Sequence, residues 1–160
     1  VRADRILGEV NGGWAVAMSI LPYERSSCFW QRIAYLYHRL QLVVDAVPAD
    51  DRAATVVGDA FVQLYALRAR SRATQHRLAA GETIGAETSI DKVLVATAEQ
   101  TTYNAARRLL SGVVEIDDSV AGELWRREYL YSRAATIYGG TAEVQRNIIA
   151  RRLLNLGADE

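Results

Sequence analysis

The sequence predicts an all-α protein, an antiparallel four-helix bundle with an additional C-terminal helix. Residues that favour turns cluster at wide intervals, at positions 8–13, 48–51, 81–85, 111–119 and 139–140. Stretches of roughly 20 to 35 residues separate these clusters and show helical periodicity. No stretch shows the alternation of a β-strand. Long helices joined by short connections are typical of an antiparallel bundle.

The first helix is expected over residues 13–46, with a kink at Pro22 and an end before Pro48. The second helix follows the 48–51 cluster. Its side chains at spacings of three and four form an apolar stripe with small polar members, which should face the core. This stripe comprises Val57, Phe61, Leu64, Leu67, Ser71, Thr74 and Leu78.

A third helix should follow the 81–85 cluster, and a fourth is expected over residues 117–133. The fifth should begin at Thr141, whose hydroxyl suits a helix N-cap, with Glu143 near the positive helix start. The predicted buried stripe of the third helix comprises Ile90, Leu94, Thr97, Thr101, Ala105 and Leu109. The predicted buried side chains of the fifth are Val144, Ile148, Ile149 and Leu153.

Composition bounds the function classes. The 160 residues suit one domain, and their formal net charge of zero gives no reason to expect nucleic-acid or membrane binding. Cys28 is the only cysteine, which excludes an internal disulfide and a thiolate metal cluster. His38 and His76 lie on separate helices, so no metal site is predicted. No apolar run approaches the roughly 20 residues of a membrane span and no signal peptide is visible, so a cytoplasmic location is expected.

Three segments carry a family resemblance. Residues 137–151 read Ile-Tyr-Gly-Gly-Thr-Ala-Glu-Val-Gln-Arg-Asn-Ile-Ile-Ala-Arg, and residues 7–14 read Leu-Gly-Glu-Val-Asn-Gly-Gly-Trp, followed by Glu24-Arg25. A weaker match is Ser-Ile-Asp-Lys at residues 89–92. With the predicted architecture, these segments resemble the C-terminal helical domain of acyl-CoA dehydrogenases. A generic Gly-Gly turn capped by Thr141 is the alternative interpretation of the last segment.

The resemblance implies a domain organisation and a chemistry. Residues 1–12 would connect from a middle β-domain absent from this sequence, and residues 13–160 would form the helical domain. Because the chain starts in the manner of a protein's middle, we expect a fragment or a processed chain. Family members oxidise acyl-CoA thioesters to trans-2-enoyl-CoA: a carboxylate removes the α-proton, and the β-hydrogen passes as hydride to FAD. We expect the isolated 160 residues to bind no FAD and to be inactive.

The residue that removes the α-proton is not where many family members have it. Their catalytic Glu opens the Glu-Gly-Thr sequence before the last helix, and Gly139 occupies that position here. Glu24-Arg25 matches a branch of the family, including isovaleryl-CoA dehydrogenase, that carries this Glu in the first helix of the domain. Helical spacing also places Glu24 on an apolar face, where a carboxylate needs a partner or a role. The alternative is a structural ion pair of Glu24 with an arginine of another helix, such as Arg68 or Arg72.

The remaining site residues also follow from the resemblance. Arg25 would lie near the acyl-CoA substrate, the alternative being a solvated surface arginine. Gly140, Thr141 and Glu143 would face FAD. A capped helix start is compatible with this role, because helix N-termini bind anions and polar cofactors.

Two expected cofactor motifs are missing. Family members carry an Arg followed shortly by Phe-Gly, which holds the FAD pyrophosphate of a neighbouring subunit, whereas residues 47–54 read Val-Pro-Ala-Asp-Asp-Arg-Ala-Ala. Arg52 is a candidate remnant of that Arg. A Gln-x-x-Gly-Gly-x-Gly stretch is replaced by Ser-Gly-Val-Val-Glu at residues 111–115.

These departures keep several hypotheses open. We expect a homo- or hetero-oligomer, and paired non-identical subunits would explain the incomplete site. The first hypothesis is a domain of an active acyl-CoA dehydrogenase. The second is a non-catalytic assembly domain that supports a paired subunit, and the third is a helical interaction module without flavin.

Overall fold

The computed structural model describes residues 2–25 and 29–157. These residues form α-helices joined by short connections, with a 3₁₀ turn at Ala3–Arg5 before them and a π-helical segment at Ile149–Leu153 after them. The all-α class is therefore confirmed. The α-helices are α1 (Gly13–Glu24), α2 (Phe29–Ala46), α3 (Asp51–Ala79), α4 (Thr88–Leu109), α5 (Val120–Ala134) and α6 (Ala142–Ile148).

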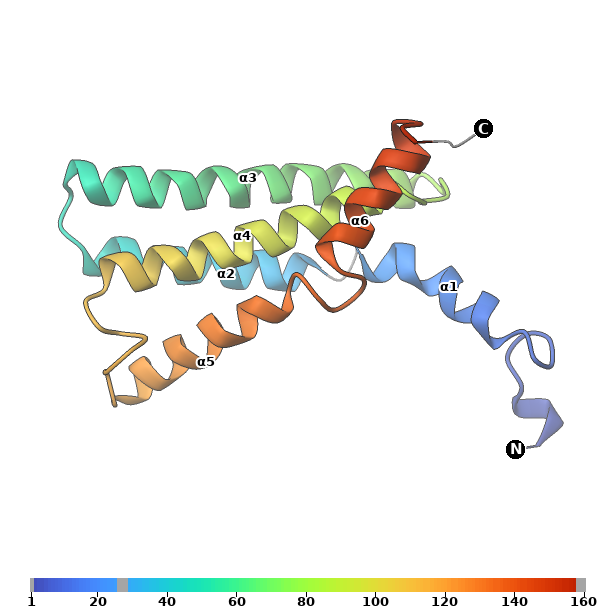
Figure 1. Cartoon of the computed structure of the whole chain (residues 1–160), viewed down its shortest axis with the longest axis horizontal. Coiled ribbons are helices and arrows are strands. Elements are labelled where there is room, and N and C mark those ends of the chain that lie inside the picture. Colours follow the sequence, from blue (N-terminus) through green and yellow to red (C-terminus); the bar gives the residue numbers. More distant parts are fainter. Residues whose placement is uncertain (1, 26–28, 158–160) are drawn as a thin grey trace.

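Helices α2 to α5 run up and down beside one another as the antiparallel bundle, and α6 is the additional C-terminal helix (Figure 1). Helix α6 crosses the end of the bundle from which α1 extends. Helix α4 is central, because it contacts each of the other five helices. Its side chains are therefore covered on several sides.

The expected single helix over residues 13–46 is described as two, α1 and α2. Pro22 lies inside α1, and α1 ends two residues later at Glu24. Residues 26–28, which include Cys28, lie outside the described residues. Helix α2 belongs to the bundle, whereas α1 has no buried residue.

On α3 the predicted buried stripe is correct from Leu64 to Thr74. Before Leu64 the buried face is shifted by one residue from the predicted one. Leu64 and Leu67 are fully buried, but Phe61 is 49% exposed and Ala60 is buried in its place. The small Ala60 permits close helix contact, while the Phe61 ring lies at the edge of the interface against Tyr37.

The face predicted to be buried on α4 was wrong. Of the six residues in that stripe only Ala105 is buried, whereas Asp91, Lys92 and Glu99 are 0–3% exposed. Because the helix is central, its polar faces are buried as well as its apolar one. Partners from other helices then satisfy these charged side chains.

The residues predicted to bury α6 were also wrong. Val144 and Leu153 are 47% and 38% exposed, and Ile148 and Ile149 are half-buried. The buried residue of α6 is Gln145, whose Nε2 donates hydrogen bonds to the preceding turn. Polar contacts therefore hold the start of α6.

The core changes character along the bundle. We call the half around the start of α4 the polar half, because Asp91, Lys92 and Glu99 are buried there. The half around the end of α4 is the apolar half, with Val43 and Trp125 among its buried residues. No helix in the described ranges is long and apolar enough to span a bilayer.

Candidate functional site

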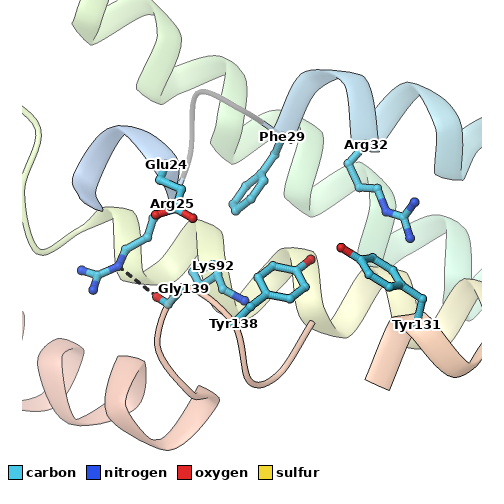
Figure 2. A pocket seen from close by; sticks show the side chains of 8 residues that line it. All are labelled: Glu24, Arg25, Phe29, Arg32, Lys92, Tyr131, Tyr138 and Gly139. Carbon is cyan, nitrogen blue, oxygen red and sulfur yellow. Dashed lines mark hydrogen bonds between the residues drawn. The ribbon is translucent and has the colours of Figure 1, made fainter. Parts of the chain in front are cut away.

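A cavity of about 270 Å³ lies in the polar half, between the end of α1, the start of α2, α4 and the turn after α5 (Figure 2). Residues from both ends of the sequence meet there. The cavity is lined by Glu24, Arg25, Phe29, Arg32, Lys92, Tyr131, Tyr138 and Gly139.

The structure brings Glu24 and Arg25 to this cavity. Arg25 Nε donates a hydrogen bond of 3.4 Å to the Gly139 carbonyl oxygen, which joins the end of α1 to the turn before α6. Burial lowers the pKa of Arg25, the Glu24 charge opposes that change, and Arg152 adds to it. The half-buried Arg25 is therefore not the solvated arginine of the alternative hypothesis.

The surroundings of Glu24 differ from the sequence expectation. Glu24 is exposed, Ile20 is 56% exposed and α1 has no buried residue, so the face of α1 that carries Glu24 is not buried in this domain. The two arginines named as examples of a partner lie elsewhere, because Arg68 lies over the Tyr37 ring and Arg72 donates to His76. Among the described residues Glu24 forms no ion pair, and it faces the cavity without a fixed cation.

Lys92 is the cavity residue whose role sequence reasoning missed. Its ammonium is buried, donates a hydrogen bond to the Ala135 carbonyl oxygen and lies 4.4 Å from the centroid of the Tyr138 ring. Burial lowers the pKa of Lys92, while the charges of Glu99 and Glu24 oppose that change. One signal was available, because Lys92 is the only lysine in the sequence.

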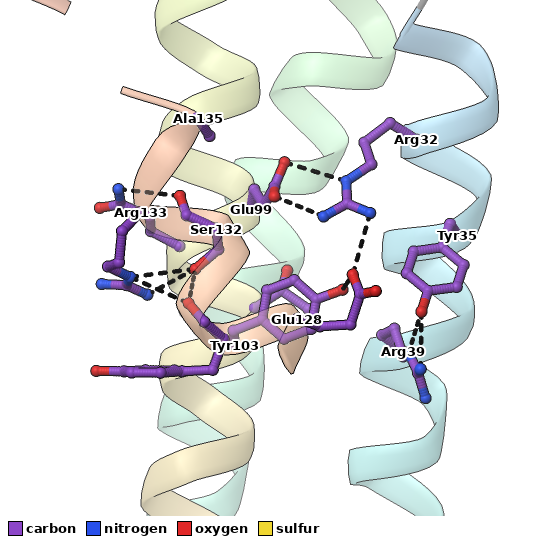
Figure 3. Close-up of polar contacts among 12 residues, drawn as sticks. Arg32, Tyr35, Arg39, Glu99, Tyr103, Glu128, Ser132, Arg133 and Ala135 are labelled. Atoms are coloured by element: carbon purple, nitrogen blue, oxygen red, sulfur yellow. Dashed lines mark hydrogen bonds and ion pairs between the residues drawn. The ribbon is translucent and has the colours of Figure 1, made fainter. Parts of the chain in front are cut away.

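A buried ionic network borders the cavity (Figure 3). Arg32 donates to both carboxylate oxygens of Glu99, at 3.1 and 2.5 Å, and to Glu128 at 3.3 Å. The Tyr103 hydroxyl also donates to Glu128. Although burial alone would lower the pKa of Arg32, hydrogen bonding and charge from Glu99 raise it. The network gives the cavity a rigid charged wall, which the sequence pattern did not predict.

The turn at Gly139 and Gly140 requires glycine. Both residues have positive φ, at +64° and +95°. A Cβ on Gly139 would lie 3.2 Å from Lys92 Cε, and a Cβ on Gly140 would lie 2.4 Å from Gln145 Nε2. Gln145 donates to the carbonyl oxygens of both glycines, at 3.0 and 3.4 Å. A glutamate at position 139 would therefore be strained in this turn.

Thr141 and Glu143 lie at the start of α6, next to the cavity but not among its lining residues. Thr141 Oγ1 accepts a hydrogen bond of 3.3 Å from the Val144 N–H, which confirms the predicted cap. Hydrogen bonds from its own N–H and from Thr141 lower the pKa of the exposed Glu143. This ionised carboxylate suits a hydroxyl group of a flavin cofactor and repels a phosphate.

Gln145 supports a polar ligand at the same place. Its Oε1 is buried and has no hydrogen-bond partner in the described chain. Together with Thr141 and Glu143, this orphaned acceptor fits the sugar-like hydroxyl groups of FAD. The start of α6 is thus compatible with the uncharged part of the cofactor.

The loop between α2 and α3 does not fit a pyrophosphate. Asp50 caps α3, because its Oδ1 accepts a hydrogen bond of 2.7 Å from the Ala53 N–H. Arg52 donates to the Arg108 carbonyl oxygen at 2.9 Å. The only arginine of residues 47–54 therefore has a structural contact, and two carboxylates, Asp50 and Asp51, disfavour an anion.

Comparison with protein families and curated proteins agrees with the fold and with the family that the sequence resembles. Residues 11–154 match the family model described as acyl-CoA dehydrogenase, C-terminal domain. Acyl-CoA dehydrogenase IpdE1 of Mycobacterium tuberculosis is 34% identical over 161 residues, which cover 96% of this chain and 41% of that protein. The protein of the same name from Mycolicibacterium smegmatis is 34% identical over 168 residues, covering 96% and 39%. The chain thus spans about two-fifths of these relatives.

Solved structures share the architecture. Butyryl-CoA dehydrogenase from Megasphaera elsdenii superposes with a TM-score of 0.80 at 20% identity, covering 96% of this chain and 42% of that chain. A structure titled Tcur3481-Tcur3483 steroid ACAD has a TM-score of 0.81 at 18% identity, covering 99% and 44%. At these identities the likeness shows the fold alone.

Proposed function

Since this chain belongs to the acyl-CoA dehydrogenase family as its C-terminal helical domain, we propose that it is part of a flavin-dependent enzyme that dehydrogenates an acyl-CoA thioester. The observation that carries this proposal is the meeting of Glu24 and Arg25 with the turn before α6 at one cavity. Bound FAD would supply the redox chemistry by accepting the β-hydrogen as hydride.

Glu24 is the proposed base. It faces the cavity and forms no ion pair within residues 2–25 and 29–157, and the family's other base position holds Gly139, whose backbone disfavours a longer side chain. The α-proton of a thioester is weakly acidic, so the carboxylate must be shielded from water. Glu24 is exposed here, and the proposal requires the remaining part of the protein and the substrate to cover it.

Arg25 is the proposed substrate-binding residue. Its guanidinium lies at the cavity between Glu24 and the Gly139 carbonyl, where it can donate to an oxygen of the acyl-CoA. Gly140, Thr141 and Glu143 would hold the FAD. Of these, Glu143 has an ionised carboxylate that can accept a hydrogen bond, while the Thr141 hydroxyl accepts from the Val144 N–H and donates to Glu143.

A second function is favoured by the α2–α3 loop. Asp50 and Asp51 would repel a pyrophosphate, and Arg52 donates a hydrogen bond to the Arg108 carbonyl oxygen of α4. Under this alternative the domain supports a paired subunit, and the partner holds the complete cofactor site. Both functions place the domain in a homo- or hetero-oligomer.

The test uses the full-length protein with any paired subunit. FAD content and acyl-CoA oxidation are measured in the wild type and in Glu24→Gln, with Glu82→Gln as an exposed control. If Glu24 is the base, Glu24→Gln lowers turnover by about 10²- to 10⁴-fold while FAD is retained. Unchanged turnover in Glu24→Gln would exclude Glu24 as the base. Turnover that depends only on the partner's residues would favour the assembly function.

A further inference from the structure

Lys92 touches three positions of the turn that follows α5. Its ammonium donates to the Ala135 carbonyl oxygen and lies beneath the Tyr138 ring, and its Cε lies 3.2 Å from where a Cβ on Gly139 would be. These positions lie 43 to 47 residues away from Lys92 in the sequence, as the numbering shows. A single side chain of α4 thus contacts the turn at three of its positions.

We propose that Lys92 is a positioning residue of the proposed dehydrogenase site, and the inference rests on that function. By holding the turn against α4, Lys92 makes the Tyr138 ring a wall of the cavity and keeps the Gly139 carbonyl opposite Arg25 (Figure 2). Lys92 acts through these residues and not on the reacting atoms.

The chemistry of burial supports this role. An ammonium group loses its hydration when buried, and that cost is large unless polar partners replace the water. None of the ion pairs in residues 2–25 and 29–157 includes Lys92, so a carbonyl oxygen and an aromatic face provide the compensation. An apolar side chain of similar length would fill the space without this cost. We therefore attribute the presence of an amine at this buried position to its contacts with the Ala135 carbonyl oxygen and the Tyr138 ring.

The turn is coupled to the substrate side of the site. The Gly139 carbonyl oxygen accepts from Arg25 Nε on one side and from Gln145 Nε2 on the other. If the contact with Lys92 is lost, the Tyr138 ring and the Gly139 carbonyl are no longer tied to α4. Both the cavity wall and the Arg25 guanidinium would then shift, which weakens substrate binding more than the chemical step.

The positioning role should depend on pH, because it requires the protonated ammonium of Lys92. Around Lys92, Glu99 lies on the same helix, Glu24 and Arg25 are at the end of α1, and Tyr138 is in the turn. The cavity is completed by Arg32 of α2 and by Tyr131 of α5. Burial lowers the pKa of Lys92, so the ammonium loses its proton at a lower pH than an exposed lysine. Above that pH the attraction to the Tyr138 ring is lost.

The test compares Lys92→Met, Lys92→Arg and the exposed control Arg127→Met in the full-length FAD-loaded protein. Hydrogen exchange of residues 135–141 measures the turn, and steady-state kinetics measures the site. In Lys92→Met assayed with saturating FAD we expect faster exchange of the turn amides and a KM for acyl-CoA raised about tenfold or more with a smaller change in kcat. Lys92→Arg should restore part of this loss. The wild-type KM should rise at alkaline pH, and Lys92→Met should remove that rise.

The outcomes separate this proposal from the proposed function. Unchanged exchange in Lys92→Met, or faster exchange with unchanged KM, would overturn the positioning role. If the wild type oxidises no acyl-CoA but Lys92→Met still shows faster exchange, the dehydrogenase function is refuted. Lys92 would then have only a structural role in the turn. If Lys92→Met does not fold, the KM of Lys92→Arg and the pH dependence of the wild-type KM test the positioning role. A wild-type KM that does not rise at alkaline pH would then contradict the proposal.

Discussion

The two halves of the bundle use opposite means of packing. In the apolar half, α4 buries Ala105 and Ala106 against apolar neighbours. In the polar half the same helix buries Asp91, Lys92 and Glu99, each with partners from other parts of the chain. One helix therefore has a conventional core at its end and a charged one at its start.

The two halves differ in what their buried side chains contribute to the free energy of folding. Burial of apolar area is favourable without any particular partner, whereas a buried charge is costly unless its partners are well placed. The polar half contains the cavity, which Lys92 lines directly and Glu99 borders through its ion pair with the lining residue Arg32.

The largest expected effect comes from breaking the buried network. Glu99→Ala leaves the partly buried Arg32 with Glu128 alone and should destabilise the fold by about 3–5 kcal/mol. Leu40→Ala, in the apolar half, should cost roughly 2–5 kcal/mol by leaving a cavity. Urea unfolding measures both. Glu115→Ala, which breaks the exposed pair with Arg107, is the control and should change little. A Glu99 loss no larger than this control would show that the network does not hold the polar half.

The glycine turn gives a smaller effect. Gly140→Ala places a Cβ 2.4 Å from Gln145 Nε2 at a φ of +95°, and should cost about 1–3 kcal/mol. The matched control in the apolar half is Gly58→Ala, where no atom lies within 4 Å of the new Cβ. Inside helix α3 that change should stabilise by about 0.5–1 kcal/mol. Thermal unfolding of the two variants should thus shift in opposite directions, and equal shifts would contradict the requirement for glycine.

The smallest effect is a dependence on acid. Although burial alone would raise the pKa of Glu87, hydrogen bonds from its own N–H and from Arg77 lower it below its usual 4.5. A carboxyl group with a lowered folded pKa stabilises above its unfolded pKa, and this stability is lost as pH falls through the folded pKa. Urea midpoints of Glu87→Gln should therefore fall less on acidification than those of the wild type. Asp59→Asn, on the exposed side of α3, is the control, and an identical acid response in Glu87→Gln and wild type would exclude this contribution.

Local patterns predicted the helices and turns well. The turn clusters at 48–51, 81–85, 111–119 and 139–140 coincide with the connections observed between α2 and α6, because glycine, proline and capping residues act within a few positions. Thr141 was correctly predicted as a cap for the same reason. The site was predicted only through motifs at Glu24, Arg25 and Thr141, and their roles remain predictions.

What periodicity could not predict was which face of α4 is buried. Arg32 pairs with Glu99 across 67 positions, and Lys92 meets Ala135 across 43. A pattern that assigns charged residues to the surface fails for such a helix, since the partners that permit burial are distant in the sequence. The roles of Lys92, Glu99 and Gln145 became visible only in three dimensions.

The sequence by itself determined the all-α class, the positions of the turns and the family, because these depend on local propensities and on short runs of neighbouring residues. The tertiary structure decided the central position of α4, the burial of its charges and the meeting of Arg25 with Gly139. These features depend on contacts between residues far apart in the chain, and only the packing of the helices brings such residues together.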